Sequence, residues 1–179
     1  MPFNFIQCPI QGLVEIQPKI FNDARGCFFE CWSRREYEEA GINLPFVQDN
    51  QSCSVKGVLR GLHFQKKHPQ GKLIRAVEGE VFDVAVDLRE GFASCGKWHG
   101  VVLSGKNQNQ LYIPPGFAHG YLVMSEKAVV AYKCTDFYYP GDEGGVVWND
   151  SDIGIDWPDL GMEYILSDKD KVLPRFNEL

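Results

Sequence analysis

The strongest constraint on the fold is the alternation of apolar and polar residues along EVFDVAVDLRE, residues 80–90. An extended strand points successive side chains to opposite faces, which here separates two sets: Phe82, Val84, Val86 and Leu88 on one face, and Asp83, Ala85 and Asp87 on the other. Similar short runs follow, separated by turn residues: WHGVVLS (98–104), QLYIP (110–114), GYLVM (120–124) and AVVAYKC (128–134). Strands at this spacing predict a sandwich or barrel rather than alternating strands and helices.

Helical signals are scarce. In SRREYEEAG (33–41), Ser33 can cap a helix, Glu36 follows three residues later and Gly41 can end it. This pattern predicts one short surface helix. The stretch 148–170 reads as a loop, because Asp, Gly and Pro interrupt every apolar pair. We expect it to be ordered by packing on the barrel and to form a wall of a site.

The length of 179 residues, without linkers or repeats, predicts a single domain. A net charge of −6 argues against non-specific binding to nucleic acid or membranes, but it leaves room for a local basic pocket. No apolar run is long enough for a membrane span, and the N-terminus lacks the pattern of a signal peptide. None of the six cysteines forms a CxxC pair. We therefore expect a soluble cytoplasmic protein with reduced thiols.

Two histidine-containing stretches resemble the two motifs of the cupin superfamily, a jelly-roll (double-stranded β-helix) barrel. One runs from Gly57 to His63 and the other is PPGFAH (114–119). Metal-binding cupins carry a second histidine two residues after the first, and then a glutamate. Here Gln65 takes that position, and no glutamate lies between Gln65 and Lys72. Since a transition-metal site needs about three protein ligands, we expect no metal.

The strand-like stretch VLRGLHFQ (58–65) contains two residues that a half-buried strand does not favour, Arg60 and His63. A histidine satisfied within the core is the simplest reading of His63, but its polar neighbours Gln65 and Lys72 favour a functional one. A regular strand would place Arg60 and His63 on opposite faces. If both meet one ligand, Gly61 is the expected position of a bulge.

Longer blocks resemble the dTDP-4-dehydrorhamnose 3,5-epimerase family: FVQDNQS (46–52), VLRGLHFQ (58–65), QGKLIRAVEGEVFDVAVDLR (70–89), IPPGFAHGY (113–121), YKCTDFYYPGDEGGVVWNDSDIGIDWP (132–158) and LSDKD (166–170). The resemblance implies a cofactor-free, metal-free homodimeric cupin that inverts C3 and C5 of dTDP-4-dehydro-6-deoxyglucose through enolates. The product would be the precursor of dTDP-L-rhamnose. It also implies one domain over 1–179, with a barrel core at about 45–150, an N-terminal dimer-forming segment and a C-terminal wrapping segment.

The resemblance assigns four catalytic roles. His63 is the base, Asp170 is the carboxylate that pairs with it, Tyr132 is the proton donor and Lys72 lies near the enolate oxygen. Asp168 competes locally with Asp170 for the pairing role. Without the resemblance, a core tyrosine, a solvated lysine and a solvated tail aspartate would explain these residues equally well.

The resemblance also implies a set of substrate-binding residues. Arg60 would meet the diphosphate, where a guanidinium matches two oxygens, and Tyr138 would influence how the sugar is reprotonated. Part of the N-terminal block would act across the dimer interface. The full binding set is Arg25, Glu30, Gln48, Asp49, Asn50, Arg60, His119, Tyr138, Glu143 and Lys169.

Three other functions remain open. The chain could be a mono-epimerase at C3 or C5 of a related dTDP-4-keto-6-deoxy sugar, or a 3,4-ketoisomerase, although ketoisomerases tend to carry a different histidine arrangement. It could also be a non-catalytic cupin that binds a sugar or anion. The combination of His63, Asp170, Tyr132 and Lys72 favours an enzyme, because a binding protein needs no paired base and acid.

Overall fold

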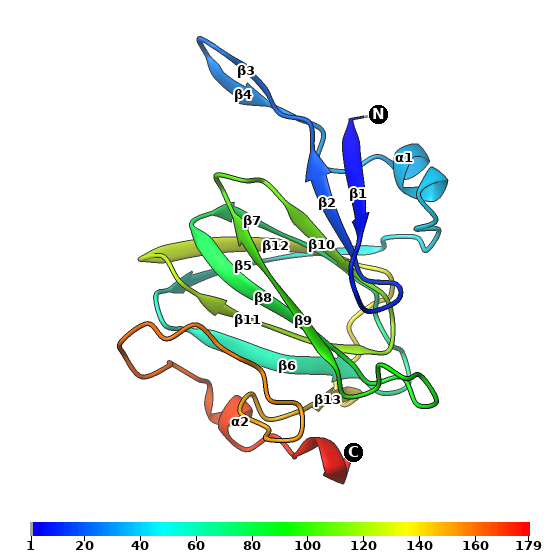
Figure 1. Cartoon of the computed structure of the whole chain (residues 1–179), viewed down its shortest axis with the longest axis vertical. Helices are drawn as coiled ribbons and strands as arrows, with labels where there is room; N and C mark the ends of the chain where they lie inside the picture. Colours follow the sequence, from blue (N-terminus) through cyan, green and yellow to red (C-terminus); the bar gives the residue numbers. More distant parts are fainter. Residues whose placement is uncertain (1) are drawn as a thin grey trace.

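The computed structural model describes residues 2–179 and consists mainly of two antiparallel β-sheets packed face to face (Figure 1). The elements are β1 (Phe3–Gln7), β2 (Val14–Pro18), β3 (Phe21–Asp23), β4 (Gly26–Phe28), α1 (Arg34–Glu39), β5 (Gln48–Val55), β6 (Leu59–Gln65), β7 (Lys72–Glu78), β8 (Glu80–Asp87), β9 (Trp98–Ser104), β10 (Gln110–Ile113), β11 (Phe117–Val123), β12 (Lys127–Cys134), β13 (Glu143–Gly145), α2 (Asp168–Lys171) and the 3₁₀ turn η1 (Phe176–Glu178). The predicted mostly-β jelly-roll with short peripheral helices is confirmed.

The two large sheets use most of the chain. One has the strand order β1-β2-β10-β7-β12-β5, and the other has the order β13-β6-β11-β8-β9. Strands β3 and β4 form a separate hairpin that projects away from both sheets (Figure 1). The N-terminal strands therefore extend the barrel, because β2 pairs with β10.

Strand β8 explains how the core is divided. Val81 and Ala85 point between the sheets, where they belong to the main apolar cluster. Val84 and Val86 point to the outer face, where Ile153, Ile155, Trp157 and Phe176 of the C-terminal segment cover them. The separation predicted for EVFDVAVDLRE is confirmed, and the stretch 148–170 packs on the barrel as expected. Because both faces of this sheet are covered, strand β11 is buried along its whole length.

The predicted helix is present as α1, between an extended Ser33 and a positive-φ Gly41. The Ser33 hydroxyl makes no capping hydrogen bond. One face of the helix is more deeply buried than a surface helix requires, since Tyr37 is 1% exposed and packs edge-on against Phe3 and Phe5. The helix thereby covers the outer face of the six-stranded sheet.

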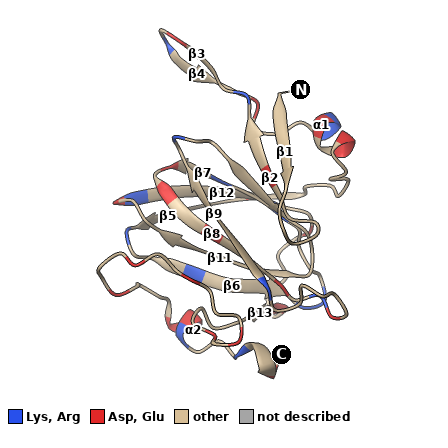
Figure 2. Ribbon diagram, viewed as in Figure 1, with Lys and Arg blue, Asp and Glu red and all other residues tan. Residues whose placement is uncertain are grey.

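Charge is dispersed over the surface. Figure 2 shows acidic and basic residues scattered over the loops, with both signs on α1 and α2. None of the helices within residues 2–179 is both long and apolar enough to cross a membrane.

Candidate active site

A cavity of about 480 Å³ lies inside the barrel, with walls from both sheets and from the C-terminal segment. Strands β6 and β11 form one wall, β7 and β12 supply residues from the opposite sheet, and residues 165–170 close the cavity. Seven of the predicted site residues line it: Arg60, His63, Lys72, His119, Tyr132, Lys169 and Asp170.

A register shift in β6 lets one strand supply two of these residues. Against β11, His63 pairs with His119 and Arg60 pairs with Tyr121. On β6, two residues lie between Arg60 and His63, whereas on β11 only one residue lies between their partners Tyr121 and His119. Strand β6 therefore contains one extra residue, as in a β-bulge. The extra residue lies at the predicted position: Gly61 has φ +119°, and a Cβ there would approach the backbone of β11 to 2.6 Å.

His63 is paired with a buried carboxylate. Its Nε2 lies 2.6 Å from Oδ1 of Asp170, which is 3% exposed. Helix α2 holds Asp170 in place, since the Ser167 hydroxyl accepts a hydrogen bond from its backbone N–H. The competing Asp168 is exposed and pairs with Lys171. With Asp170 ionised, Nε2–H donates to the carboxylate and Nδ1 carries the free lone pair.

Burial tunes the protonation of His63 and Lys72. Desolvation lowers the pKa of His63, the hydrogen bond and charge of Asp170 oppose this, and the charges of Lys72 and Lys169 lower it further. Burial also lowers the pKa of Lys72, against the smaller opposing effects of Cys134 and Asp83. A neutral imidazole and a desolvated ammonium thus line one cavity.

Tyr132 is the acid candidate on the opposite sheet. It lies on β12, and its side chain faces the cavity that contains His63. Burial is the main cause that raises the pKa of Tyr132 to about 12, so the phenol keeps its proton near neutral pH. The neighbouring Tyr121 hydroxyl forms a hydrogen bond of 2.8 Å with the hydroxyl of Ser52. This bond links β11 of one sheet to β5 of the other across the cavity lining.

A smaller cavity of about 150 Å³ adjoins the first and shares His63, Lys72 and Tyr132 with it. Four more predicted residues line it: Gln48, Asn50, Tyr138 and Glu143. Glu143 forms an ion pair with Lys169, and this contact lowers the pKa of Glu143. Tyr138 reaches the cavity from an irregular segment, because β12 ends at Cys134 and does not continue to residue 138.

Three predicted binding residues lie outside both cavities of this chain. Asp49 points to the other face of β5, where it pairs with Lys133 at 3.0 Å. Arg25 lies on the projecting hairpin, 89% exposed and paired with Asp23, and Glu30 follows β4. Side chains alternate along β5, which directs Asp49 away from the cavities. The hairpin β3–β4 projects outward, which keeps Arg25 and Glu30 away from both cavities of their own chain.

One buried pair was not anticipated from the sequence. His119 Nε2 lies 2.9 Å from Oδ2 of Asp83, and Asp83 is fully buried on β8. The signal was present in EVFDVAVDLRE, because a carboxylate on a core strand requires a partner. Among residues 2–179, neither Arg60 nor Lys72 lies within ion-pair distance of a carboxylate. Two cations thus remain available to an anionic ligand.

All six cysteines are free thiols, and only Cys134 is buried. Cys134 is buried at the end of β12, where it accepts a hydrogen bond from Asn50 at 3.5 Å. Burial raises the pKa of the Cys134 thiol. The thiol therefore stays protonated and packs as a small apolar group.

Known proteins resemble this chain over most of its length. A model of the dTDP-4-dehydrorhamnose 3,5-epimerase family matches residues 7–178. The dTDP-4-dehydrorhamnose 3,5-epimerase of Methanothermobacter thermautotrophicus is 49% identical over 170 residues, which cover 94% of this chain and 92% of that protein. A 3,5-epimerase of Legionella pneumophila, solved in complex with dTDP-4-keto-L-rhamnose, is 50% identical with a TM-score of 0.95, covering 98% of this chain and 93% of that one.

A solved 3′-monoepimerase of Streptomyces bikiniensis has the same fold at a greater distance. Its complex with dTDP-quinovose is 32% identical with a TM-score of 0.89, covering 95% of this chain and 86% of that one. Fold similarity therefore extends to enzymes of one-carbon specificity, whereas the family model and the relatives near 50% identity are 3,5-epimerases. This chain belongs to the dTDP-4-dehydrorhamnose 3,5-epimerase family.

Proposed function

We propose that the protein epimerises dTDP-4-dehydro-6-deoxy-D-glucose at C3 and C5, yielding dTDP-4-dehydro-L-rhamnose for dTDP-L-rhamnose synthesis. The observation that carries this proposal is the placement of the His63–Asp170 pair and Tyr132 in one cavity, on opposite sheets, with Lys72 beside them. An epimerisation next to a carbonyl needs a base on one side of the sugar and an acid on the other.

Each residue has a distinct role in this reaction. His63 takes the proton from the carbon next to the C4 carbonyl, and Asp170 stabilises the imidazolium that forms. The C–H electron pair moves to the C4 oxygen, where Lys72 stabilises the enolate. Tyr132 then protonates the opposite face of the same carbon. The His63 imidazolium releases its proton to solvent, and the Tyr132 phenolate takes one up from solvent, so both residues return to their starting states. The step repeats at the second carbon without any net oxidation.

The charge of the cavity supports a nucleoside diphosphate substrate. Arg60 lies at one side of the cavity, with its guanidinium hydrogen-bonded only to the hydroxyl of Ser54 among the described side chains. A diphosphate offers the paired oxygens that a guanidinium binds best. We assign Arg60 to the diphosphate, and Gln48, Asn50, His119, Glu143 and Lys169 to the remaining contacts with the substrate.

We further propose that the active form is a homodimer in the cytoplasm. The hairpin β3–β4 exposes Phe21 by 52% and Phe28 by 71%, and neither belongs to a core cluster. Covering these residues with a second chain would bring Arg25 and Glu30 to the partner's cavity. Six free thiols suit a reducing compartment.

The test is isotope exchange with dTDP-4-dehydro-6-deoxyglucose in D₂O. We expect deuterium at both C3 and C5, measured by proton NMR. His63→Ala should slow exchange by about 100-fold to 10,000-fold, because that is the typical contribution of a general base. His99→Ala is the matched control, since His99 lies on β9 outside both cavities and its loss should leave the rate unchanged.

The outcomes separate the competing functions. Label at one carbon alone would replace the proposal with a mono-epimerase. Binding of the substrate without any label would identify a non-catalytic sugar-binding protein. Exchange that persists in a folded His63→Ala variant would remove His63 from the role of base.

A further inference from the structure

The loop that carries Tyr138 has no regular secondary structure. It begins at Thr135, after the end of β12, and ends at Asp142, before β13. Sheet hydrogen bonds therefore do not fix Tyr138, although its side chain lines the cavity beside His63. The position of Tyr138 must depend on side chains that bind the loop backbone.

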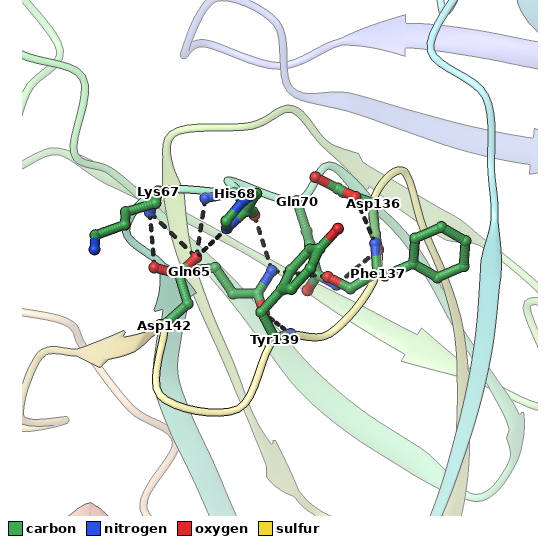
Figure 3. Close-up of polar contacts among 8 residues, drawn as sticks. All are labelled: Gln65, Lys67, His68, Gln70, Asp136, Phe137, Tyr139 and Asp142. Carbon is green, nitrogen blue, oxygen red and sulfur yellow. Dashed lines mark hydrogen bonds and ion pairs between the residues drawn. The ribbon is translucent and has the colours of Figure 1, made fainter.

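Gln65 binds the loop on both sides of Tyr138 (Figure 3). Its side-chain Nε2 donates to the carbonyl oxygen of Phe137 at 3.0 Å, and its Oε1 accepts from the backbone N–H of Tyr139 at 2.8 Å. Nε2 also donates to the carbonyl oxygen of His68 at 2.8 Å. Gln65 is 6% exposed, so water competes little for these bonds.

Other side chains bind the middle and the C-terminal end of the same loop. Gln48 Oε1 accepts from the backbone N–H of Tyr138 at 2.9 Å. The Asp142 carboxylate accepts from the backbone and ring N–H groups of His68, and the His68 ring stacks on Tyr139 with centroids 4.1 Å apart (Figure 3). These contacts occupy the Tyr139 side chain outside the site. Of the three aromatic residues in the loop, Phe137, Tyr138 and Tyr139, it is Tyr138 that lines the cavity.

We propose that Gln65 is a positioning residue, which fixes Tyr138 relative to His63. Tyr138 lines the same cavity as the base His63 and the acid Tyr132, so its position sets how the sugar lies between them and thereby the balance of reaction between C3 and C5. This inference rests on the proposed epimerase function. Gln65 lies two residues after His63 on β6, so the strand that carries the base also holds the loop. A carboxamide is suited to this place because it offers a donor and an acceptor without a charge that would shift the protonation of His63.

The test uses Gln65→Met, which keeps the length of the side chain and removes all three hydrogen bonds. We expect the C3-to-C5 ratio of deuterium incorporation to move by about tenfold toward the ratio of Tyr138→Phe, since a displacement of about 1 Å can cost on the order of 100-fold in rate. In the double variant Gln65→Met/Tyr138→Phe, the ratio should equal that of Tyr138→Phe alone. The proposal is overturned if Gln65→Met leaves the C3-to-C5 ratio unchanged. It is also overturned if Gln65→Met changes this ratio equally in the wild-type protein and in Tyr138→Phe.

Gln110→Met is the matched control. Gln110 is also buried and also donates to a backbone carbonyl, that of Cys31, but it does not line the cavity of His63. Its loss should lower stability and leave the ratio unchanged.

A second measurement is independent of turnover. In Gln65→Met, hydrogen exchange of the Tyr139 amide should be faster by about tenfold, whereas Gln110→Met should not change it. An unchanged Tyr139 amide would show that Gln65 does not hold the loop. Failure of the wild-type protein to exchange label would count against the epimerase function instead.

Discussion

Opposing influences act on the His63 imidazole. Burial disfavours the imidazolium, as do the charges of Lys72 and Lys169, and Asp170 partly restores it through a hydrogen bond of 2.6 Å. The result is a pKa below the ordinary value of 6.5. His63 is therefore a neutral base at pH 7, yet a carboxylate is in place for the moment when it becomes charged.

The same residues predict the pH dependence of kcat/KM. On the acid side, activity should rise as His63 loses its proton, with a midpoint below pH 6.5. On the alkaline side, activity should fall as Lys72 loses its charge, at a pH below 10.5. Tyr132, with a pKa of about 12, should deprotonate only beyond this limb. Initial rates across buffers of constant ionic strength measure both limbs.

Two variants identify the groups behind these limbs. Lys72→Arg should shift the alkaline limb to higher pH, because a guanidinium keeps its proton throughout this range. Asp170→Asn should move the acid limb of the residual activity to lower pH, because it removes the influence that raises the pKa of His63. An acid midpoint above 6.5 in the wild-type protein would contradict the assignment of His63.

At the scale of elements, the irregular strand β6 decides whether the site can assemble. Arg60 and His63 line one cavity only because the extra residue at Gly61 shifts the register against β11. Gly120 lies directly opposite, and the backbones approach so closely that a Cβ at Gly61 would lie 2.8 Å from the carbonyl oxygen of His119. The position thus requires glycine for both its conformation and its space.

Gly61→Ala should lower the free energy of unfolding by about 2–5 kcal/mol, combining a positive-φ penalty of about 1–2 kcal/mol with an overpacking cost of about 1–3 kcal/mol. Gly41→Ala is the control, since Gly41 also has positive φ (+88°) but has no atom within 4 Å of the added Cβ. That variant should show only the conformational penalty. Urea denaturation compares the two variants, and equal losses would mean that the close approach to β11 contributes nothing.

The elements that could be predicted from the sequence are those in which apolar and polar residues alternate with a regular period. Alternation placed β8 and separated its faces, and Gly61 indicated the bulge because an interior glycine is rare in a strand. Tyr138 shows the limit: a strand that continued past Cys134 would place it on the face of Tyr132, but β12 ends at Cys134 and a loop brings Tyr138 to the cavity. Loops carry no periodic signal, and their contacts join residues far apart in sequence.

The catalytic residues depended on a different kind of information. The pattern around His63 indicated function, whereas Asp170 was indistinguishable from a solvated tail residue without the family resemblance. Its pairing with His63 spans 107 positions in the sequence, and the C-terminal segment must wrap the barrel before the pair exists. Asp83 could have been recognised as half of a buried pair, but its partner His119 could not be chosen from spacing alone.

At the scale of the molecule, the covering of the barrel explains where the cavity lies. Helix α1 and the residues just after it cover one outer face, and the C-terminal segment covers the other. Apolar side chains fill part of the interior, and polar ones line the remainder as the cavity. The hairpin β3–β4 has no place in this arrangement, because it extends beyond both sheets and leaves two phenylalanines exposed (Figure 1).

If the hairpin serves a second chain, Arg25 and His63 of one chain act in different cavities. Arg25→Ala and His63→Ala homodimers should both be nearly inactive. Their heterodimer, isolated with two different affinity tags, should regain about half of the wild-type rate, because one of its two cavities holds both intact residues. Pairing His63→Ala with Tyr132→Ala is the control: both residues line the same cavity, so each cavity stays defective. A tagged heterodimer as inactive as its parents, or a monomeric active protein, would assign the hairpin to its own chain.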